Sequence, residues 1–427
     1  MENNKTIINE MFFKKIIKYL PLVLIVAALL YSYKCAKGND FLSYYDVGLA
    51  FRQLLDNIYI PGKYSGMRNH YPPVFAMIMV VFTFFHPLVA GIIFYLLKLM
   101  CVIITVKMLY EIFEVKVIPM PAIWLAFLMS FRFILDDFKL GQVNVFLVCF
   151  IIFALYYKKR ENILLSSLFL SFAISIKLFP ALFLFYYFIK REYKYAGICI
   201  LTILILNVLP AIFYLNRYPQ LLYHFVKESI LNAAGDPNSG IANQSLYGML
   251  MRFLGRNGTD IKEIAFVNFA NLQFATIKII YYVISIFFIV LAFAPALKKD
   301  RTMELFEFGN IFLVALILPM VARKSNFVFV FFPALVYFTN MFYKRDFRSL
   351  SSILIWVAFI LLGFTADGIV GRKISNILEA FSNIFFGAIL IFVANCIKIF
   401  SSRFNISKDK LKNIKNEGEM FAKNWKK

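Results

Sequence analysis

The sequence predicts an all-α membrane protein that crosses the bilayer about twelve times, and its composition and the spacing of its apolar runs support this prediction. Hydrophobic residues make up 61% of the 427 positions and charged residues only 16%, and the mean hydropathy is +0.73. A soluble chain of this length needs more charge to cover its surface. The 51 Phe and 24 Tyr residues suit a lipid-facing surface with aromatic belts. We therefore interpret residues 1–427 as a single integral membrane domain.

Apolar runs of roughly the length that the hydrocarbon core requires recur along the chain, so we expect about 12 spans, within a range of about 11 to 13. Two long polar segments, at about 33–70 and 216–275, interrupt them and are expected to hold short helices. A further apolar stretch, Tyr71 to Phe85, is interpreted as a re-entrant or interfacial helix, because a full span there would invert every later loop. The predicted spans are about 14–32, 88–112, 117–134, 143–157, 162–175, 178–190, 195–215, 276–297, 304–321, 326–342, 350–366 and 378–400.

The net charge of +22 is distributed as short basic blocks between the apolar runs. This distribution is the positive-inside pattern of membrane proteins and excludes a nucleic-acid-binding groove. It predicts cytoplasmic N- and C-termini, a cytoplasmic basic tail at about 401–427, and both polar segments on the outer face. The Lys/Ile/Asn/Phe-rich composition and the lack of an internal targeting signal point to a bacterial cytoplasmic (inner) membrane.

A break inside one apolar stretch follows from the same charge pattern. If Lys158–Arg160 and Lys190–Lys194 both face the cytoplasm, the residues between them must cross twice. The proline of Lys177-Leu178-Phe179-Pro180 supplies the break between two short helices.

Ionisable and polar groups near membrane depth are costly and are therefore functional candidates. In the first polar segment, Asp40 and Tyr44 share one helix face, whereas Asp46 points elsewhere. The segment ends at Tyr71, which two prolines follow. For Asp40, a helix cap or a solvated loop residue is the structural alternative.

Further polar groups open or interrupt later apolar runs. Gln142 and Asn144 begin one span, where they either bridge helices or hold polar groups of a substrate. Lys177 lies at the predicted break, where it either binds an anion or snorkels to the interface. The second polar segment contributes Asn243 and Gln244, with Arg252 about two turns later.

Several other site types find no support in the sequence. The three histidines are too scattered for a zinc site, and no carboxylate cluster has metal-ligand spacing, so neither a metal nor a cofactor is expected. Asp136-Asp137 is interpreted as a solvated turn. Ser245 has no neighbouring His–Asp arrangement, and the five cysteines do not form a disulfide framework.

Five short motifs, taken in order, resemble glycosyltransferase family 87, the polyprenyl-phosphate-mannose-dependent α-1,2-mannosyltransferases and their relatives. Each motif alone is weak, but their order and spacing are specific, and the resemblance covers about residues 14–335. The motifs are Asp40-Phe41-Leu42-Ser43-Tyr44, Tyr71-Pro72-Pro73, Gly141-Gln142-Val143-Asn144, Ile176-Lys177-Leu178-Phe179-Pro180 and Asn243-Gln244-Ser245-Leu246.

The resemblance implies a GT-C fold with a catalytic Asp in the first outer loop, which corresponds to Asp40 rather than Asp46. One departure concerns a late outer turn, where many family members carry histidines. This chain has Leu318 to Asn326 there, without a histidine, and Arg323 or Lys324 is expected to take an electrostatic role.

The function implied is an inverting transfer of a sugar, mannose foremost, from a polyprenyl-phosphate donor to a glycan- or lipid-linked acceptor. Asp40 would be the general base, cationic side chains would face the departing phosphate, and amides and aromatic rings would hold sugar or prenyl groups. No Gly-rich nucleotide-binding motif is present, consistent with a lipid donor. The expected substrate-binding residues are Tyr44, Asp46, Tyr71, Gln142, Asn144, Lys177, Asn243, Gln244, Arg252, Arg323 and Lys324.

Two rival functions use the same features differently. A transporter or flippase of a lipid-linked sugar would need the cations but no base, and it is disfavoured by the lack of an inverted repeat. A polysaccharide polymerase or ligase would depend on outer-loop arginines rather than on Asp40.

Overall fold

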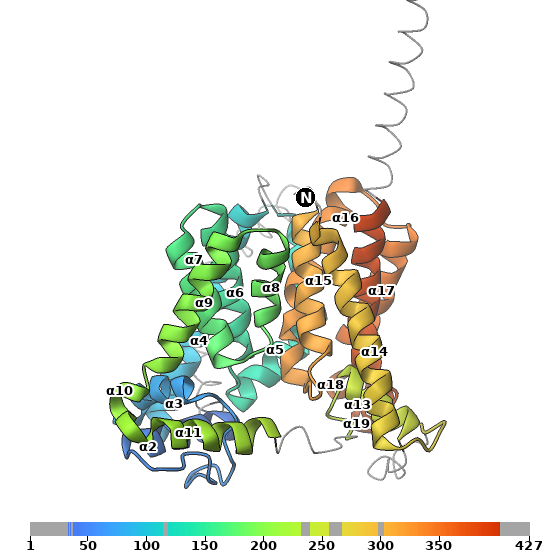
Figure 1. Cartoon of the computed structure of the whole chain (residues 1–427). Coiled ribbons are helices and arrows are strands. Elements are labelled where there is room, and N and C mark those ends of the chain that lie inside the picture. Colours follow the sequence, from blue (N-terminus) through green and yellow to red (C-terminus); the bar gives the residue numbers. More distant parts are fainter. Residues whose placement is uncertain are drawn as a thin grey trace, which may run out of the picture. The chain divides into compact units, whose positions relative to one another are not determined.

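The structure is a computed structural model of the 427-residue chain, and it describes residues 33, 35, 37–113, 118–231, 240–255, 267–297, 303–401. Within these residues the protein is helical and has no strand, apart from one isolated bridge between Gly255 and Leu272 (Figure 1). The all-α prediction is therefore confirmed. The predicted first span at 14–32 and the tail at 401–427 lie outside the described residues, except for Ser401.

The chain divides into two compact units. Unit 1 comprises Met1–Ile104, Asp137–Val143 and Val208–Ile230, and unit 2 comprises Thr105–Asp136, Asn144–Asn207 and Leu231–Lys427. Helices α4 (Pro87–Ile112) and α5 (Met120–Leu140) contribute residues to both units.

Unit 1 is built around α2 (Asn39–Arg52), which packs on α3 (Pro73–Met79) and on the 3₁₀ segment Val80–Phe84. The helices α10 (Ala211–Tyr214) and α11 (Tyr218–Phe225) complete it, and α11 contacts α3. Its core joins buried apolar side chains of α2, α3, α10 and α11 and of the segment that follows α2. This core consists of Val47, Phe51, Ile58, Tyr59, Ala76, Tyr214 and Leu221.

Unit 2 holds a set of helices that lie side by side in Figure 1, with α15 (Glu304–Ile317) among them. Every residue of α15 from Phe306 to Ile317 is buried, as expected for a helix that is apolar all round and surrounded by others. It packs against three α-helices and the 3₁₀ segment Lys324–Val330, and two further helices, α6 and α7, pack closely on each other. The three α-helices that pack on α15 are α8 (Ala181–Ile189), α14 (Phe274–Phe293) and α16 (Phe331–Lys344). The helices that pack closely on each other are α6 (Asn144–Lys159) and α7 (Ile163–Ile176).

The remaining helices of unit 2 are α9 (Tyr193–Val208, to Asn207), α13 (Leu246–Leu254), α17 (Leu350–Gly363), α18 (Asp367–Val370) and α19 (Arg372–Ala380), followed by a final helix, Asn383–Ser401. Polar residues begin several of them: the side chains of Asn162, Ser245 and Ser349 each accept a backbone hydrogen bond as N-caps of α7, α13 and α17.

Five helices of the described part are long and apolar enough to cross a membrane, and the pair α5 and α6, bent by 116°, passes the same test together. The five are Pro87–Ile112, Tyr193–Glu228, Phe274–Leu297, Lys324–Lys344 and Asn383–Ser401. The stretch interpreted as re-entrant is a short apolar helix, Pro73–Phe84. At about 1.5 Å per residue this helix is too short to cross the roughly 30 Å hydrocarbon core alone.

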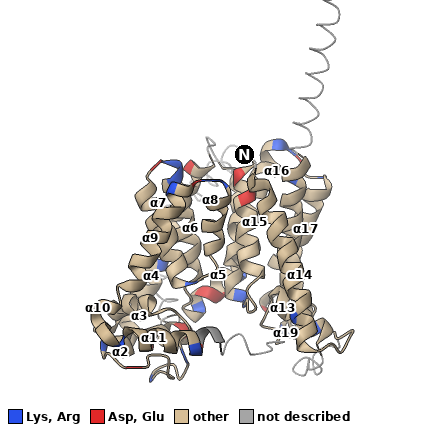
Figure 2. Cartoon of the chain, viewed as in Figure 1, with Lys and Arg blue, Asp and Glu red and all other residues tan. Residues whose placement is uncertain are grey.

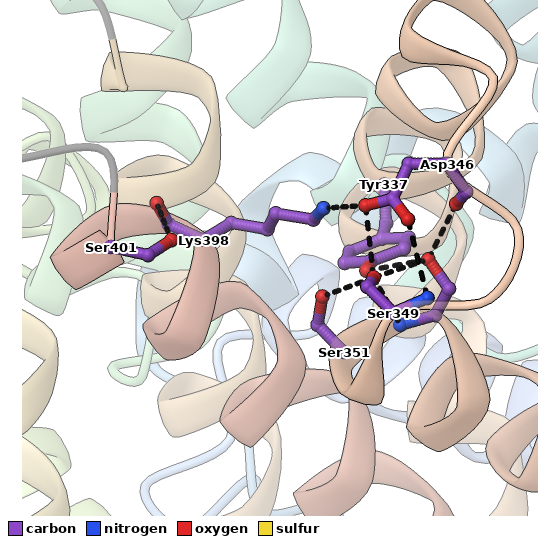
Figure 3. A network of polar contacts seen from close by, with 7 residues as sticks. Tyr337, Asp346, Ser349, Ser351, Lys398 and Ser401 are labelled. Atoms are coloured by element: carbon purple, nitrogen blue, oxygen red, sulfur yellow. Dashed lines mark hydrogen bonds and ion pairs between the residues drawn. The ribbon is translucent and has the colours of Figure 1, made fainter. Parts of the chain in front are cut away.

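In unit 2 the helix middles carry few charges, and basic residues lie near α5, α13 and α19 at one end and where α6, α8 and α16 finish at the other (Figure 2). At that end a polar network ties α16, α17 and the final helix together (Figure 3). Asp346 accepts a bond from Lys398 of the final helix, and it accepts bonds at 3.2 and 2.9 Å from the backbone N–H and hydroxyl of Ser349. The helices α13, α18 and α19 lie at the opposite end of unit 2 (Figure 1).

Candidate active site

Asp40 lies in the first turn of α2 in unit 1, where the helix dipole favours a negative charge. The chain can enter this helix because residue 38 is glycine: a Cβ at Gly38 would lie 2.5 Å from the Leu140 carbonyl oxygen. The Asp40 side chain is 9% exposed and forms neither a hydrogen bond nor an ion pair with any described residue. No protein donor among the described residues therefore engages the Asp40 carboxylate.

Three of the predicted residues meet one helical turn from Asp40. The Tyr44 hydroxyl donates to Gln142 Oε1 at 3.0 Å and lies 2.9 Å from the Tyr71 hydroxyl, which is 3.4 Å from the same Gln142 oxygen. Burial raises the pKa of Tyr44 well above its ordinary value, and the charges of Tyr71 and Asp40 raise it further. The Tyr44 hydroxyl therefore stays protonated and acts as a hydrogen-bond donor beside Asp40.

Asp46 points away from this group, as its helical spacing predicts. Its carboxylate accepts bonds from the backbone N–H of Tyr64 at 3.0 Å, and from the backbone N–H and hydroxyl of Ser65, each at 2.8 Å. The turn fits because residue 62 is glycine, where a Cβ would lie 2.1 Å from Asp46 Oδ2. Asp46 thus fastens the 62–65 turn to α2.

In unit 2, Lys177 and Asn144 are brought together. Lys177 follows the last residue of α7 in an extended conformation, and its ammonium donates to Asn144 Oδ1 at 2.8 Å. Asn144 is the first residue of α6, so the bond joins the start of α6 to the end of α7. Pro180 precedes α8 directly, which confirms the predicted helix break.

The second polar segment forms another cluster in unit 2, around the start of α13. Asn243 Oδ1 accepts from the backbone N–H of Ala322 at 3.0 Å and its Nδ2 donates to the Met320 carbonyl at 2.9 Å, while Gln244 Nε2 donates to the Glu379 carbonyl at 2.8 Å. These bonds join residues distant in sequence, so Asn243 and Gln244 shape the backbone of this region.

Arg252 is fully buried in this cluster and donates to the carbonyls of Gly240 and Asn243 and to the hydroxyl of Ser382. Burial lowers its pKa to about 10, which leaves the guanidinium charged at neutral pH. Three protein acceptors engage this guanidinium, so it holds the loop.

The late turn provides the two remaining predicted cations. Lys324 forms an ion pair with Glu379 Oε1 at 2.7 Å. Arg323 is exposed, and its side chain has no hydrogen bond or ion pair with any residue that the structure describes. Arg323 is therefore available to a ligand at the surface, whereas Lys324 is already neutralised.

Three charged side chains on the helices were missed or misassigned by the sequence interpretation. Lys98 and Asp137 form a buried ion pair of 2.8 Å within unit 1, with side chains 1% and 0% exposed. The interpretation of Asp136-Asp137 as a solvated turn is therefore wrong for Asp137. Arg132, in the middle of α5, was also missed, although a lone arginine in an apolar run is itself a signal.

No group of three or more His, Cys, Asp or Glu residues in the described ranges is arranged to hold a metal ion. The five cysteines, all among the described residues, are buried, and none of them forms a disulfide.

These features define a helical membrane protein with buried or partly buried polar clusters at the ends of its helices. Comparison with known protein families matches residues 69–323, more than half of the chain, to glycosyltransferase family 87. The chain belongs to this family and is a membrane glycosyltransferase. Neither the curated proteins nor the solved structures contain a match.

Proposed function

We propose that the chain is an inverting transferase that moves mannose from a polyprenyl-phosphate donor to a hydroxyl of a lipid- or glycan-linked acceptor. A GT-C fold with about twelve spans and catalysis at the outer face of a bacterial cytoplasmic membrane are parts of this proposal. Both termini are cytoplasmic in it, and no metal or cofactor takes part.

Asp40 carries the proposal, because its carboxylate is nearly buried and has no partner within the described residues. A general base must be free to accept a proton, and Asp46, which accepts bonds from Tyr64 and Ser65, is not. The family match begins at residue 69, so the assignment of Asp40 depends on this geometry and on the motif around it.

The proposed step is a single displacement at the anomeric carbon of the donor. Asp40 accepts the proton of the acceptor hydroxyl while its oxygen forms a bond to the anomeric carbon. The bond from that carbon to the phosphate oxygen breaks, and the polyprenyl phosphate leaves with the electron pair. Tyr44, Tyr71 and Gln142 line the same place and would bind the hydroxyls of the reacting sugars.

Lys177 is proposed to face the phosphate, with Asn144 orienting its ammonium. A groove of about 540 Å³, lined by apolar residues, begins at the next two positions, Leu178 and Phe179, and the Lys177 ammonium lies 5.9 Å from the Phe179 ring centroid. A cation beside an apolar groove fits a phosphate that carries a long hydrocarbon chain. This placement favours a lipid donor over a nucleotide sugar.

The α13 cluster is proposed to contribute Gln244, whose Oε1 is buried without a partner among the described residues, and Arg323, which is exposed. Asn243, Arg252 and Lys324 are assigned to holding the loop that presents them, because protein groups already engage their side chains.

The test is transfer by the purified protein in nanodiscs, with radiolabelled polyprenyl-phosphate-mannose and a membrane lipid extract. We expect Asp40→Asn to lose about 10²- to 10⁴-fold in rate, the usual contribution of a general base. Asp56→Asn is the matched control, since Asp56 is an exposed carboxylate of the same unit that pairs with Arg217.

Equal rates for Asp40→Asn and the wild type would remove Asp40 from the base role. If mannose, glucose and arabinose donors all gave no product with the wild type, the proposed reaction would fail. Donor flipping in liposomes would then favour the transporter.

A further inference from the structure

Arg132 is a charged side chain inside an apolar helix, and neither the family nor the proposed reaction explains it. It lies on α5 of unit 2, between Phe131 and Phe133. A charge at such a position is costly and typically faces a partner or a polar pathway. One of its three nitrogens is engaged: Nη1 donates to Thr365 Oγ1 at 3.1 Å.

The other two nitrogens, Nε and Nη2, are buried and have no hydrogen-bond partner among the described residues. They form one edge of the guanidinium, from which two N–H bonds point in parallel. This edge matches the two oxygens of a phosphate or carboxylate. Thr365 engages Nη1 on the other side of the guanidinium, so the Nε and Nη2 edge remains available to an oxyanion.

No nearby carboxylate among the described residues forms an ion pair with the Arg132 guanidinium. Glu379, Asp367 and Asp136 interact electrostatically with Arg132, but none forms an ion pair with it. Glu379 instead pairs with Lys324 through Oε1. The guanidinium therefore lies in a favourable negative field without a direct anionic partner in the described part of the chain.

Acceptors without partners surround the same place. Asn383 donates to Thr365 Oγ1 at 2.7 Å, so its side chain lies next to that of Arg132, and its Oδ1 is buried and unpartnered within the described residues. Glu379 Oε2 is likewise buried and unpartnered within the described residues, in a side chain that is 2% exposed. A ligand that combines an oxyanion with neighbouring hydroxyl groups would satisfy both the donor edge and these acceptors.

We propose that Arg132 binds the phosphate of a lipid-linked substrate through Nε and Nη2, with Asn383 and Glu379 accepting from its hydroxyl groups. Arg132 as a whole is partly exposed, while the two nitrogens are covered, so the covering side chains move aside on binding. The inference rests on the proposed function and names a residue that recognises the substrate. Two sources share this chemistry, the polyprenyl phosphate of the donor side and an acidic lipid headgroup of the acceptor side.

The test measures binding rather than transfer, with the full-length protein in phosphatidylcholine nanodiscs. Undecaprenyl phosphate and phosphatidylglycerol are titrated separately and detected by native mass spectrometry. We expect Arg132→Gln to weaken binding of one of the two lipids by about 10- to 100-fold, the value of a bidentate charged contact. Arg132→Lys keeps the charge but not the parallel donors, and we expect it to recover only part of the loss.

Arg348→Gln is the control, because Arg348 is exposed in the loop between α16 and α17 and should not affect either lipid. A loss confined to undecaprenyl phosphate assigns Arg132 to the donor, and a loss confined to phosphatidylglycerol assigns it to the acceptor. Wild-type binding of both lipids by Arg132→Gln or Arg132→Lys overturns the proposal. If Arg132→Gln does not fold, Arg132→Lys provides the decision.

The Asp40→Asn variant distinguishes a failure of the Arg132 proposal from a failure of the proposed transfer reaction. This variant should bind both lipids as the wild type does and lose only transfer. If the wild type binds lipid through Arg132 but transfers no sugar, the anion site is supported and the proposed transferase activity is refuted.

Discussion

At the scale of single residues, Asp40 and Asp46 show how two carboxylates on one helix take different tasks. Both are buried on α2, yet only Asp46 is surrounded by donors, from Tyr64 and Ser65. We expect Asp46→Asn to lower the thermal stability of the purified protein, because an amide cannot accept all of these bonds. The loss should correspond to about 1–3 kcal/mol, the usual effect of leaving buried groups unsatisfied.

The measurement is the unfolding temperature in detergent, with Asp40→Asn and Asp56→Asn compared in parallel. Asp40 has no described partner and Asp56 is exposed, so both variants should unfold close to the wild type. An Asp46→Asn variant as stable as these two would contradict the role given to the 62–65 turn.

Residue roles were only partly predictable from the sequence. Helical spacing placed Tyr44 beside Asp40 and turned Asp46 away, since both are local properties of one helix. The partners of Arg252 could not be predicted, because Ser382 approaches it from a region far along the chain. Arg132 could have been found, since an arginine in an apolar run is visible without any structure.

At the scale of elements, the close approach of residue 141 to α2 leads to a prediction about the candidate site. Gly141 has a positive φ of +71°, and a Cβ there would lie 2.5 Å from the Cβ of Phe41, the neighbour of Asp40. We expect Gly141→Ala to lower both stability and transfer, because the left-handed backbone and the contact with Phe41 both disfavour a side chain.

Gly66→Ala is the matched control for this prediction. Its φ is +64°, but a Cβ at this position would meet nothing within 4 Å. It should show only the cost of the left-handed conformation, about 1–2 kcal/mol, and keep its transfer rate. Equal activity of the two variants would show that the contact with Phe41 does not matter for the site.

The network around Asp346 links three elements and gives a pH dependence. Its hydrogen bond with the Lys398 ammonium holds the pKa of Asp346 below its usual value (Figure 3). A carboxylate with a lowered native pKa stabilises the fold above its unfolded pKa of about 3.9, and this stabilisation is lost as the pH falls through the native pKa. The wild type should therefore be more stable than Asp346→Asn at pH 7.

The difference in unfolding temperature between these two proteins should narrow as the pH is lowered below about 4. Unfolding in an acid-tolerant detergent, followed from pH 7 downwards, measures it. A difference that stays constant over this range would mean that the charge of Asp346 does not contribute, and that its neutral hydrogen bonds do.

Element boundaries were most predictable where the apolar pattern ends at a charged or polar residue. The span predicted at 162–175 is α7, Ile163–Ile176, because Asn162 caps its start and Lys177 ends it. The span predicted at 195–215 differs, since α9 ends at Val208 and a turn at Pro210 follows, inside the same apolar run. Hydropathy alone does not reveal such a turn, because the residues on both sides are equally apolar.

At the scale of the whole molecule, the orientation of unit 2 decides on which side of the membrane its candidate polar residues lie. The basic residues at the ends of α6, α8 and α16 gather at one end, and the α13 cluster lies at the other (Figure 2). From the positive-inside rule we propose that the α13 cluster faces the outside. The helix Phe274–Leu297 spans about 36 Å at 1.5 Å per residue, enough to separate the two ends by a bilayer.

This orientation predicts the labelling of two single-cysteine variants in whole cells. The five native cysteines are buried, so their background reaction with a membrane-impermeant maleimide should be low. Phe269→Cys, at a side chain 73% exposed before α14, should react in intact cells. Arg348→Cys, in the loop after α16, should react only after the membrane is permeabilised. The reverse pattern would place the α13 cluster in the cytoplasm, where the proposed acceptor chemistry at the outer face could not occur, because the lipid-linked sugar would then have to react on the inner leaflet.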